Sequence, residues 1–154
     1  MKYITKILTV AALISAVYAT AAMAEPASRV LNEGTRITIT AGDVVIPAIL
    51  NDSVTSQDLI SKLPYTMTSR RYSHDYCGVM PDPLVYNEED VHYGWLNGDL
   101  AFARDSDYFV MFFADEENSS VYGHQITLGK INADLEVLRG LPSGSIQIII
   151  ALAE

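Results

Sequence analysis

The sequence contains a single cysteine, Cys77, in 154 residues. One cysteine cannot form a disulfide within the chain, which excludes a disulfide-stapled fold and leaves a buried thiol, a reactive thiol or an intermolecular bridge. Stability must therefore come from the packing of apolar side chains, which make up 49% of the residues. The sequence also lacks internal repeats and low-complexity stretches.

Basic residues are scarce as well. Ten lysines and arginines stand against 19 aspartates and glutamates, which gives a formal net charge of −9. A chain this acidic repels nucleic acid and anionic lipid, so neither is expected as a partner. The same charge would also simply keep an exported protein in solution. The partners that remain are a peptide or small-molecule ligand, or another protein.

The apolar run at the N-terminus has the features of a bacterial Sec-type signal peptide. Lys2 and Lys6 precede an apolar stretch that ends near Val17, and Ala22-Met23-Ala24 supplies small residues at the cleavage positions. The stretch is shorter than the roughly 20 residues that span a bilayer, so we expect cleavage, no membrane anchor, and a periplasmic or secreted protein. Cleavage would leave eight basic residues against 19 acidic ones, a net charge of −11. The expected organisation is a signal peptide at 1–24, a lead-in at 25–34 and one domain at 35–154.

Short strand-like segments dominate the rest of the chain, which indicates a mainly β fold: residues 36–40 alternate with period two, and residues 110–113 are continuously apolar. The predicted strands are 36–40, 44–50, 65–71, 100–103, 108–114, 124–131 and 146–152. Short strands separated by loops favour a closed barrel or a sandwich.

Two short helices interrupt the strands. One is predicted within 51–63, where Thr55 and Asp58 resemble a capping box, and another at 133–140. Residues 72–80 are predicted to form a loop. One helix follows the first hairpin and the other precedes the last strand. This arrangement is consistent with a barrel that has a helix covering each of its two ends.

Several short motifs occur in an order and spacing that can be compared with known protein families. They are Leu50-Asn51-Asp52-Ser53, Leu63-Pro64, Asp75-Tyr76-Cys77, Gly94-Trp95-Leu96-Asn97-Gly98-Asp99, the run 108–117, Ser120-Val121-Tyr122 and Leu128-Gly129-Lys130-Ile131. In this order and spacing they resemble the small prokaryotic cyclophilin-like domain proteins. The resemblance implies a closed eight-stranded cyclophilin-like β-barrel with two short capping helices, and it brings no settled activity.

True cyclophilins are prolyl isomerases, and the resemblance does not extend to their active-site pattern. That pattern has an arginine followed a few residues on by phenylalanine and then glutamine. Here Arg70 and Arg71 are followed by Tyr72-Ser73-His74, with no such pair after them. The isomerase residues therefore cannot be assigned in this chain.

The segment SRRYSHDYCGVM, residues 69–80, concentrates reactive side chains. Cys77 could be a nucleophile if His74 came within hydrogen-bond reach and Asp75 oriented that histidine. Nothing in the spacing demands this, and a small apolar thiol that packs against the barrel is the favoured interpretation. A redox-linked dimer through Cys77 is a further hypothesis.

Metal and cofactor sites are not predicted. Structural zinc sites show paired ligands at short spacing, and only one short cluster exists here. The ligands considered are His74, Asp75, Cys77, His92 and His124.

Aromatic and arginine side chains suggest a binding groove, because aromatics with a polar edge suit an apolar ligand and arginines donate to carbonyls or carboxylates. The candidate groove residues are Arg70, Arg71, Tyr72, Tyr76, Trp95, Arg104 and Tyr122. The aromatics could equally pack over the barrel ends. The leading functional hypothesis is a non-enzymatic peptide- or small-ligand-binding module. The alternative is a prolyl isomerase in which one of the three arginines stabilises the twisted amide.

Overall fold

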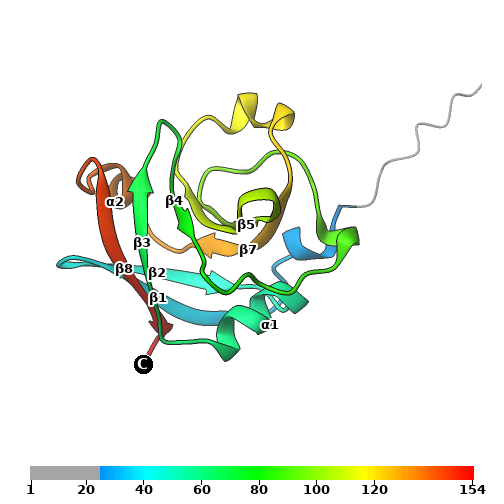
Figure 1. Cartoon of the computed structure of the whole chain (residues 1–154), viewed down its shortest axis with the longest axis horizontal. Helices are drawn as coiled ribbons and strands as arrows, with labels where there is room; N and C mark the ends of the chain where they lie inside the picture. The colour runs from blue at the N-terminus through cyan, green and yellow to red at the C-terminus, as the bar shows by residue number, and fades with distance from the viewer. Residues whose placement is uncertain (1–24) are drawn as a thin grey trace, which may run out of the picture.

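The computed structural model describes residues 25–154, which form a closed barrel of antiparallel strands in the order β1-β2-β7-β5-β6-β4-β3-β8 (Figure 1). The strands are β1 (Thr35–Ala41), β2 (Val44–Leu50), β3 (Tyr65–Arg71), β4 (Asp75–Val79), β5 (Asp99–Ala103), β6 (Tyr108–Phe112), β7 (Gln125–Ile131) and β8 (Ser145–Leu152). The predicted mainly β, eight-stranded barrel is confirmed. The predicted signal peptide, 1–24, lies outside the described residues.

The inward-facing side chains of the strands form the core that fills the barrel. In β1 every second side chain points inward, and Ile39 faces Ile46 of β2 and Ile150 of β8 across the two strand pairs. All three are fully buried. Closing the sheet leaves no unpaired edge, so the alternation separates an apolar interior from the outer face.

Two helices lie on opposite sides of the barrel, as Figure 1 shows. They are α1 (Val54–Ser61) and α2 (Glu136–Arg139). The predicted capping box is wrong by two residues, because Ser53 is the N-cap and its side chain accepts a hydrogen bond from the Ser56 backbone N–H. Both helices bury a leucine in the core, Leu59 and Leu138. Across residues 25–154, no helix is long and apolar enough to cross a membrane.

The largest departure from the predicted elements is β4, which occupies part of the predicted loop 72–80. Asp75, Tyr76 and Cys77 lack the usual signature of a strand, yet they pair in register with β6. Tyr76 points into the barrel, whereas Asp75 and Cys77 point outward. A side chain at Gly78 would overlap the Thr68 carbonyl, so glycine is what lets β3 and β4 approach.

The lead-in is attached to the barrel. Residues Ala27–Arg29 form a 3₁₀ turn, η1, in which the Ser28 backbone N–H donates to Asp90 Oδ1 at 3.1 Å. Asn51 Nδ2 donates to the carbonyls of Ser28 and Thr127. The three other 3₁₀ turns are η2 (Glu88–Asp90), η3 (Arg104–Ser106) and η4 (Glu116–Val121).

Candidate functional site

A pocket of about 480 Å³ opens on the outer face of strands β4, β5 and β6. It exists because β5 reads Asp-Leu-Ala-Phe-Ala, so that Leu100 and Phe102 point inward while Ala101 and Ala103 leave the outer face shallow. In the strand register Ala103 lies between Tyr108 and Gln125, two larger side chains. The lining residues are Tyr72, Ser73, His74, Asp75, Cys77, Trp95, Ala103, Tyr108, Val110, Phe112, Tyr122, Gly123 and Gln125.

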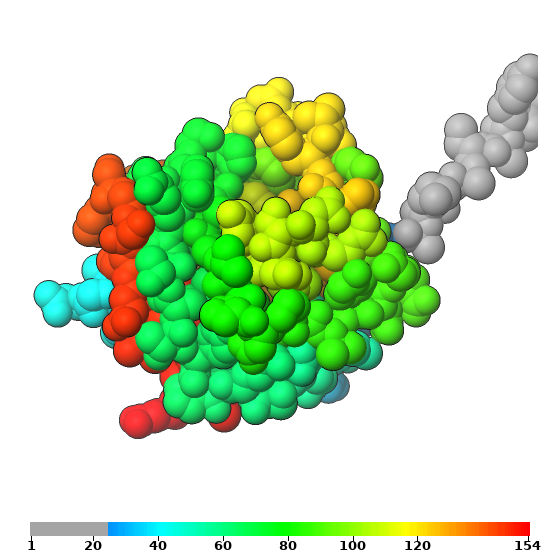
Figure 2. All heavy atoms as spheres, in the orientation of Figure 1, coloured from blue at the N-terminus to red at the C-terminus, as the bar shows by residue number. Residues whose placement is uncertain are grey.

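The rims of the pocket come from two segments that are distant in the sequence. Figure 2 shows the β3–β4 connection, in green, beside the segment around η4, in yellow. The ring centroids of His74 and Tyr122, one from each segment, are 5.9 Å apart. The side chains of Tyr72 and Tyr122 are about half exposed, at 48% and 49%. A ligand that enters from solvent can therefore contact both.

Trp95 forms one wall of the pocket and is only 3% exposed. Its indole stacks on Phe112 and on His74, with centroid distances of 4.2 and 4.7 Å. Its Nε1–H donates to the Ala114 carbonyl at 2.9 Å, and its backbone N–H donates to Ser119 Oγ at 3.0 Å. These contacts fix the wall before any ligand arrives.

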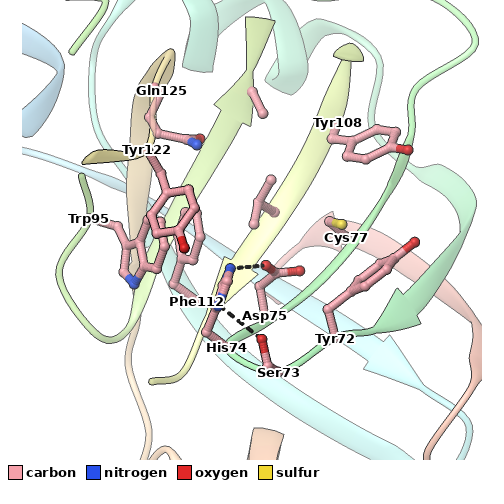
Figure 3. Close-up of a pocket in the computed structure, with 13 residues that line it drawn as sticks. Tyr72, Ser73, His74, Asp75, Cys77, Trp95, Tyr108, Phe112, Tyr122 and Gln125 are labelled. Atoms are coloured by element: carbon pink, nitrogen blue, oxygen red, sulfur yellow. Dashed lines mark hydrogen bonds and ion pairs between the residues drawn. The ribbon is translucent and has the colours of Figure 1, made fainter. Parts of the chain in front are cut away.

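A buried carboxylate lies in the pocket. Figure 3 shows the Asp75 carboxyl between two groups of side chains, which are Tyr72, Cys77 and Tyr108 on one side and Trp95, Phe112 and Tyr122 on the other. His74 Nε2 lies 3.1 Å from Asp75 Oδ2, and Ser73 Oγ lies 3.1 Å from the other ring nitrogen of His74. Burial raises the pKa of the Asp75 carboxyl above its ordinary value, and the nearby Cys77 thiol and His74 offset this only in part.

The Cys77 thiol is buried at the base of the pocket. Burial raises its pKa well above the ordinary value, and the negative charge of Asp75 raises it further. A nucleophilic cysteine needs the opposite environment, one that stabilises the thiolate. The thiol packs with Val110, Phe112 and Ala101 on the outer face.

The structure brings together some of the predicted groove residues and separates others. Tyr72, Trp95 and Tyr122 line the pocket, and so does Cys77, which was predicted separately as a possible reactive thiol. Tyr76 does not, because alternation along β4 turns it into the barrel, where it is fully buried.

The three predicted arginines lie outside the pocket lining. Arg71 lies at a barrel end, where its guanidinium donates to the Arg139 and Leu141 carbonyls. Arg104 is paired with Glu88, at 2.8 Å. Arg70 is opposite Cys77 in the β3–β4 register but is exposed to solvent. The predicted groove of aromatics and arginines is therefore corrected to a pocket of aromatics around a carboxylate.

Several lining residues escaped the sequence analysis, namely Ala103, Tyr108, Phe112 and Gln125. Each occupies an outward position of a strand and pairs with a neighbour that also lines the pocket, Phe112 with Asp75 and Ala103 with both Tyr108 and Gln125. The alternation in β5 was a usable signal for Ala103, since it separates small outward residues from large inward ones. Which strands are neighbours, however, depends on the barrel order.

The comparisons with known proteins agree with this architecture. A family model described as the cyclophilin-like family matches residues 39–151. The chain belongs to the cyclophilin-like family. Its cyclophilin-like barrel is also similar to the solution structure of a hypothetical protein from Archaeoglobus fulgidus, with 17% sequence identity and a TM-score of 0.64. That match covers 79% of this chain and 98% of the archaeal one, and it shows a shared fold.

Two further findings bear on the site of this cyclophilin-like barrel. No curated protein sequence matches the chain. Within the described part of the chain, no group of three histidine, cysteine, aspartate or glutamate side chains is placed to hold a metal ion.

Proposed function

We propose that this cyclophilin-like barrel is an exported, non-enzymatic module that binds a peptide or small molecule in its outer-face pocket. The observation that carries the proposal is a preformed pocket of about 480 Å³ with a fixed aromatic wall. Ligand sites in proteins are mostly apolar concavities of roughly 300–1,000 Å³ with a few placed polar groups. Here the polar groups are Asp75, His74 and Gln125, and neither nucleic acid nor lipid is an expected partner of so acidic a chain.

Binding is favoured over catalysis by the state of the Cys77 thiol and by the position of the arginines. The Cys77 thiol has a raised pKa, which keeps it protonated and weakly nucleophilic. The isomerase alternative relied on an arginine beside the twisted amide, and the lining residues include none. We therefore expect no acceleration of prolyl isomerisation in a standard proline-peptide assay. Acceleration that is lost in Arg70→Ala or Arg104→Ala would instead support the isomerase.

The binding proposal can be tested with a panel of short capped peptides and ¹⁵N NMR. The panel is Ac-Ala-Xaa-Ala-NH₂, in which Xaa is leucine, phenylalanine, proline, glutamate, lysine or arginine. Because Trp95 is the only tryptophan of the sequence, the spectrum holds one indole N–H signal, which reports on the pocket wall. We expect at least one peptide to shift this signal together with the amides of Ala103 and Val110.

A matched pair of variants makes the test specific. Ala103→Phe fills the shallow part of the pocket and should abolish the shifts. Val45→Phe places the same ring at an exposed position of β2, which is not part of the pocket lining, and should leave them unchanged. If no peptide of the panel shifts the indole signal, or if both variants bind equally, the pocket is not the binding site.

Export is a separate part of the proposal and has its own measurement. Expressed in a Gram-negative host with its leader, the protein should be recovered from the periplasm with Glu25 as its first residue, as read by intact mass. An uncleaved chain in the cytosol would contradict the leader assignment without affecting the pocket.

A further inference from the structure

We propose that the ligand of the pocket carries an organic cation, a protonated amine or a guanidinium, which donates to Asp75, and a separate N–H or O–H donor that reaches Gln125. This inference rests on the proposed binding function and names the chemical class of the ligand. Three properties of the pocket carry it: an unpartnered carboxylate oxygen, an unpartnered amide oxygen, and aromatic rings around them.

The first property concerns Asp75, whose side chain faces the pocket although the residue is only 7% exposed. One of its oxygens, Oδ2, is paired with His74. The other, Oδ1, is buried and lies within hydrogen-bond geometry of no donor among the described residues, although the Cys77 thiol, a weak donor, is close enough to the carboxyl to lower its pKa. A buried carboxylate oxygen without a donor destabilises the fold, so its retention in a pocket is explained if a ligand supplies the donor.

The second property concerns Gln125, which is 6% exposed and lines the same pocket from β7. Its Oε1 is also buried without a partner among residues 25–154. In the register of β5, Ala103 separates Gln125 from Tyr108, so the small alanine leaves room for a group beside the amide. Two unsatisfied acceptors in one pocket require a ligand that donates at more than one point.

The third property is the aromatic lining. The face of an aromatic ring carries negative electrostatic potential and attracts cations, most strongly for tryptophan. Besides the stacked pair of Trp95 and Phe112, the lining includes three tyrosines, Tyr72, Tyr108 and Tyr122.

The charges around the pocket also favour a cationic ligand. No lysine or arginine lines it, and residues 25–154 carry eight basic against 19 acidic residues. Arg70 is the basic residue opposite Cys77 in the register, but its exposed charge is screened by water and salt. An anionic ligand would meet the Asp75 carboxylate and the Gln125 amide oxygen, and His74, the basic residue of the lining, is already paired with Asp75. A neutral apolar ligand would leave both acceptors unsatisfied.

The experiment compares charged peptides with neutral isosteres on the unmodified protein. Ac-Ala-Lys-Ala-NH₂ is titrated against its norleucine analogue, and Ac-Ala-Arg-Ala-NH₂ against its citrulline analogue, at pH 7 with the Trp95 indole signal as the readout. We expect the better charged peptide to bind at least about tenfold more tightly than its isostere, as is typical of a charge-assisted hydrogen bond. The pair with the larger ratio distinguishes an ammonium from a guanidinium ligand.

Two variants locate the charge that the ligand recognises. Asp75→Asn removes the carboxylate and should abolish the preference for the charged peptide. Asp43→Asn changes the net charge equally at the exposed β1–β2 turn and should preserve it. If Asp75→Asn does not fold, the comparison on the unmodified protein still decides the matter.

The outcomes separate the two proposals. If the norleucine, citrulline or glutamate peptides bind in the pocket as tightly as the lysine and arginine peptides, the cation inference is wrong and the binding function stands. An unchanged preference in Asp75→Asn would equally overturn it. If no peptide of any class shifts the indole signal, the binding function itself fails.

Discussion

The indole of Trp95 lies parallel to the ring of Phe112, with 4.2 Å between the centroids and 4° between the planes. Trp95 belongs to the segment that precedes β5, whereas Phe112 is the last residue of β6. The stack therefore fastens a connecting segment to the outer face of the barrel. It also supplies the fixed wall on which the proposed binding function depends.

Replacing Phe112 with leucine tests the contribution of this stack to stability. Leucine keeps most of the apolar area but loses the ring-on-ring geometry, so Phe112→Leu should lower the free energy of unfolding by about 1 kcal/mol in urea titrations. The fluorescence of Trp95 should change as well, because the indole loses its neighbour. Tyr108→Leu, which alters the pocket without touching the stack, is the control. Equal fluorescence changes in both variants would show that the stack does not set the environment of Trp95.

The reactivity of Cys77 should depend on Asp75. At pH 8 the folded protein should react with iodoacetamide far more slowly than the urea-unfolded protein, because burial and the nearby carboxylate raise the thiol pKa. Asp75→Asn removes the charge, lowers the thiol pKa and should accelerate alkylation of the folded protein. Asp43→Asn should not. Rapid alkylation of the unmodified folded protein would revive the nucleophile hypothesis.

Arg71 should act on stability rather than on binding. Its Nη1 donates to the Arg139 carbonyl at 2.8 Å and the Leu141 carbonyl at 3.2 Å, and its guanidinium lies 4.9 Å from the Phe113 ring centroid. Lysine is shorter and has no planar group to lie over the Phe113 ring while donating to both carbonyls, so Arg71→Lys should cost about 1–2 kcal/mol of unfolding free energy.

The neighbouring Arg70 provides the matched control for that substitution. It is exposed to solvent, so Arg70→Lys should change the free energy of unfolding by less than about 0.5 kcal/mol. Peptide-induced shifts of the Trp95 indole signal should be the same in both variants. If Arg71→Lys loses those shifts while its free energy of unfolding is unchanged, Arg71 takes part in ligand binding rather than in stability.

The barrel was predictable from the sequence because its strands are short, apolar or alternating segments bounded by turn residues. Residues 44–50 and 65–71 were predicted with their observed bounds, the first as an entirely apolar segment that follows a turn and the second as a partly alternating segment that begins after Pro64. The strand β4 was missed because Asp75 and Cys77 face the pocket rather than water or the core. A strand that carries a site on its outer face loses the pattern by which strands are found.

The site was predictable only in part, for a related reason. Trp95 and Tyr122 were singled out as aromatics in turns, and both line the pocket. Tyr76 and Cys77 are adjacent in the sequence, yet they face opposite sides of the barrel wall, which composition cannot reveal. Gln125 reaches the pocket only because β7 pairs with β5, and that order follows from the closure of the barrel.

The attachment of the lead-in should depend on pH through His92. Its Nε2 accepts a hydrogen bond from Arg29 Nε at 3.3 Å, and burial together with the Arg29 charge lowers the pKa of His92 to about 4. In the unfolded chain the imidazole titrates near its ordinary pKa of 6.5. Between about pH 6.5 and 4 the unfolded state therefore binds a proton that the folded state does not, and stability falls as the pH falls.

His92→Gln isolates this effect, because the glutamine amide oxygen can accept from Arg29 without titrating. The free energy of unfolding, measured in urea from pH 7 to 4, should fall in the unmodified protein relative to the variant, with a slope of up to about 1.4 kcal/mol per pH unit. Asp99 contributes with the opposite sign, since burial raises its pKa to about 6, but it is present in both proteins and cancels in the difference. Parallel pH profiles for the two proteins would mean that His92 has the same pKa in the folded and unfolded states. Burial and the Arg29 charge would then not keep it neutral in the fold.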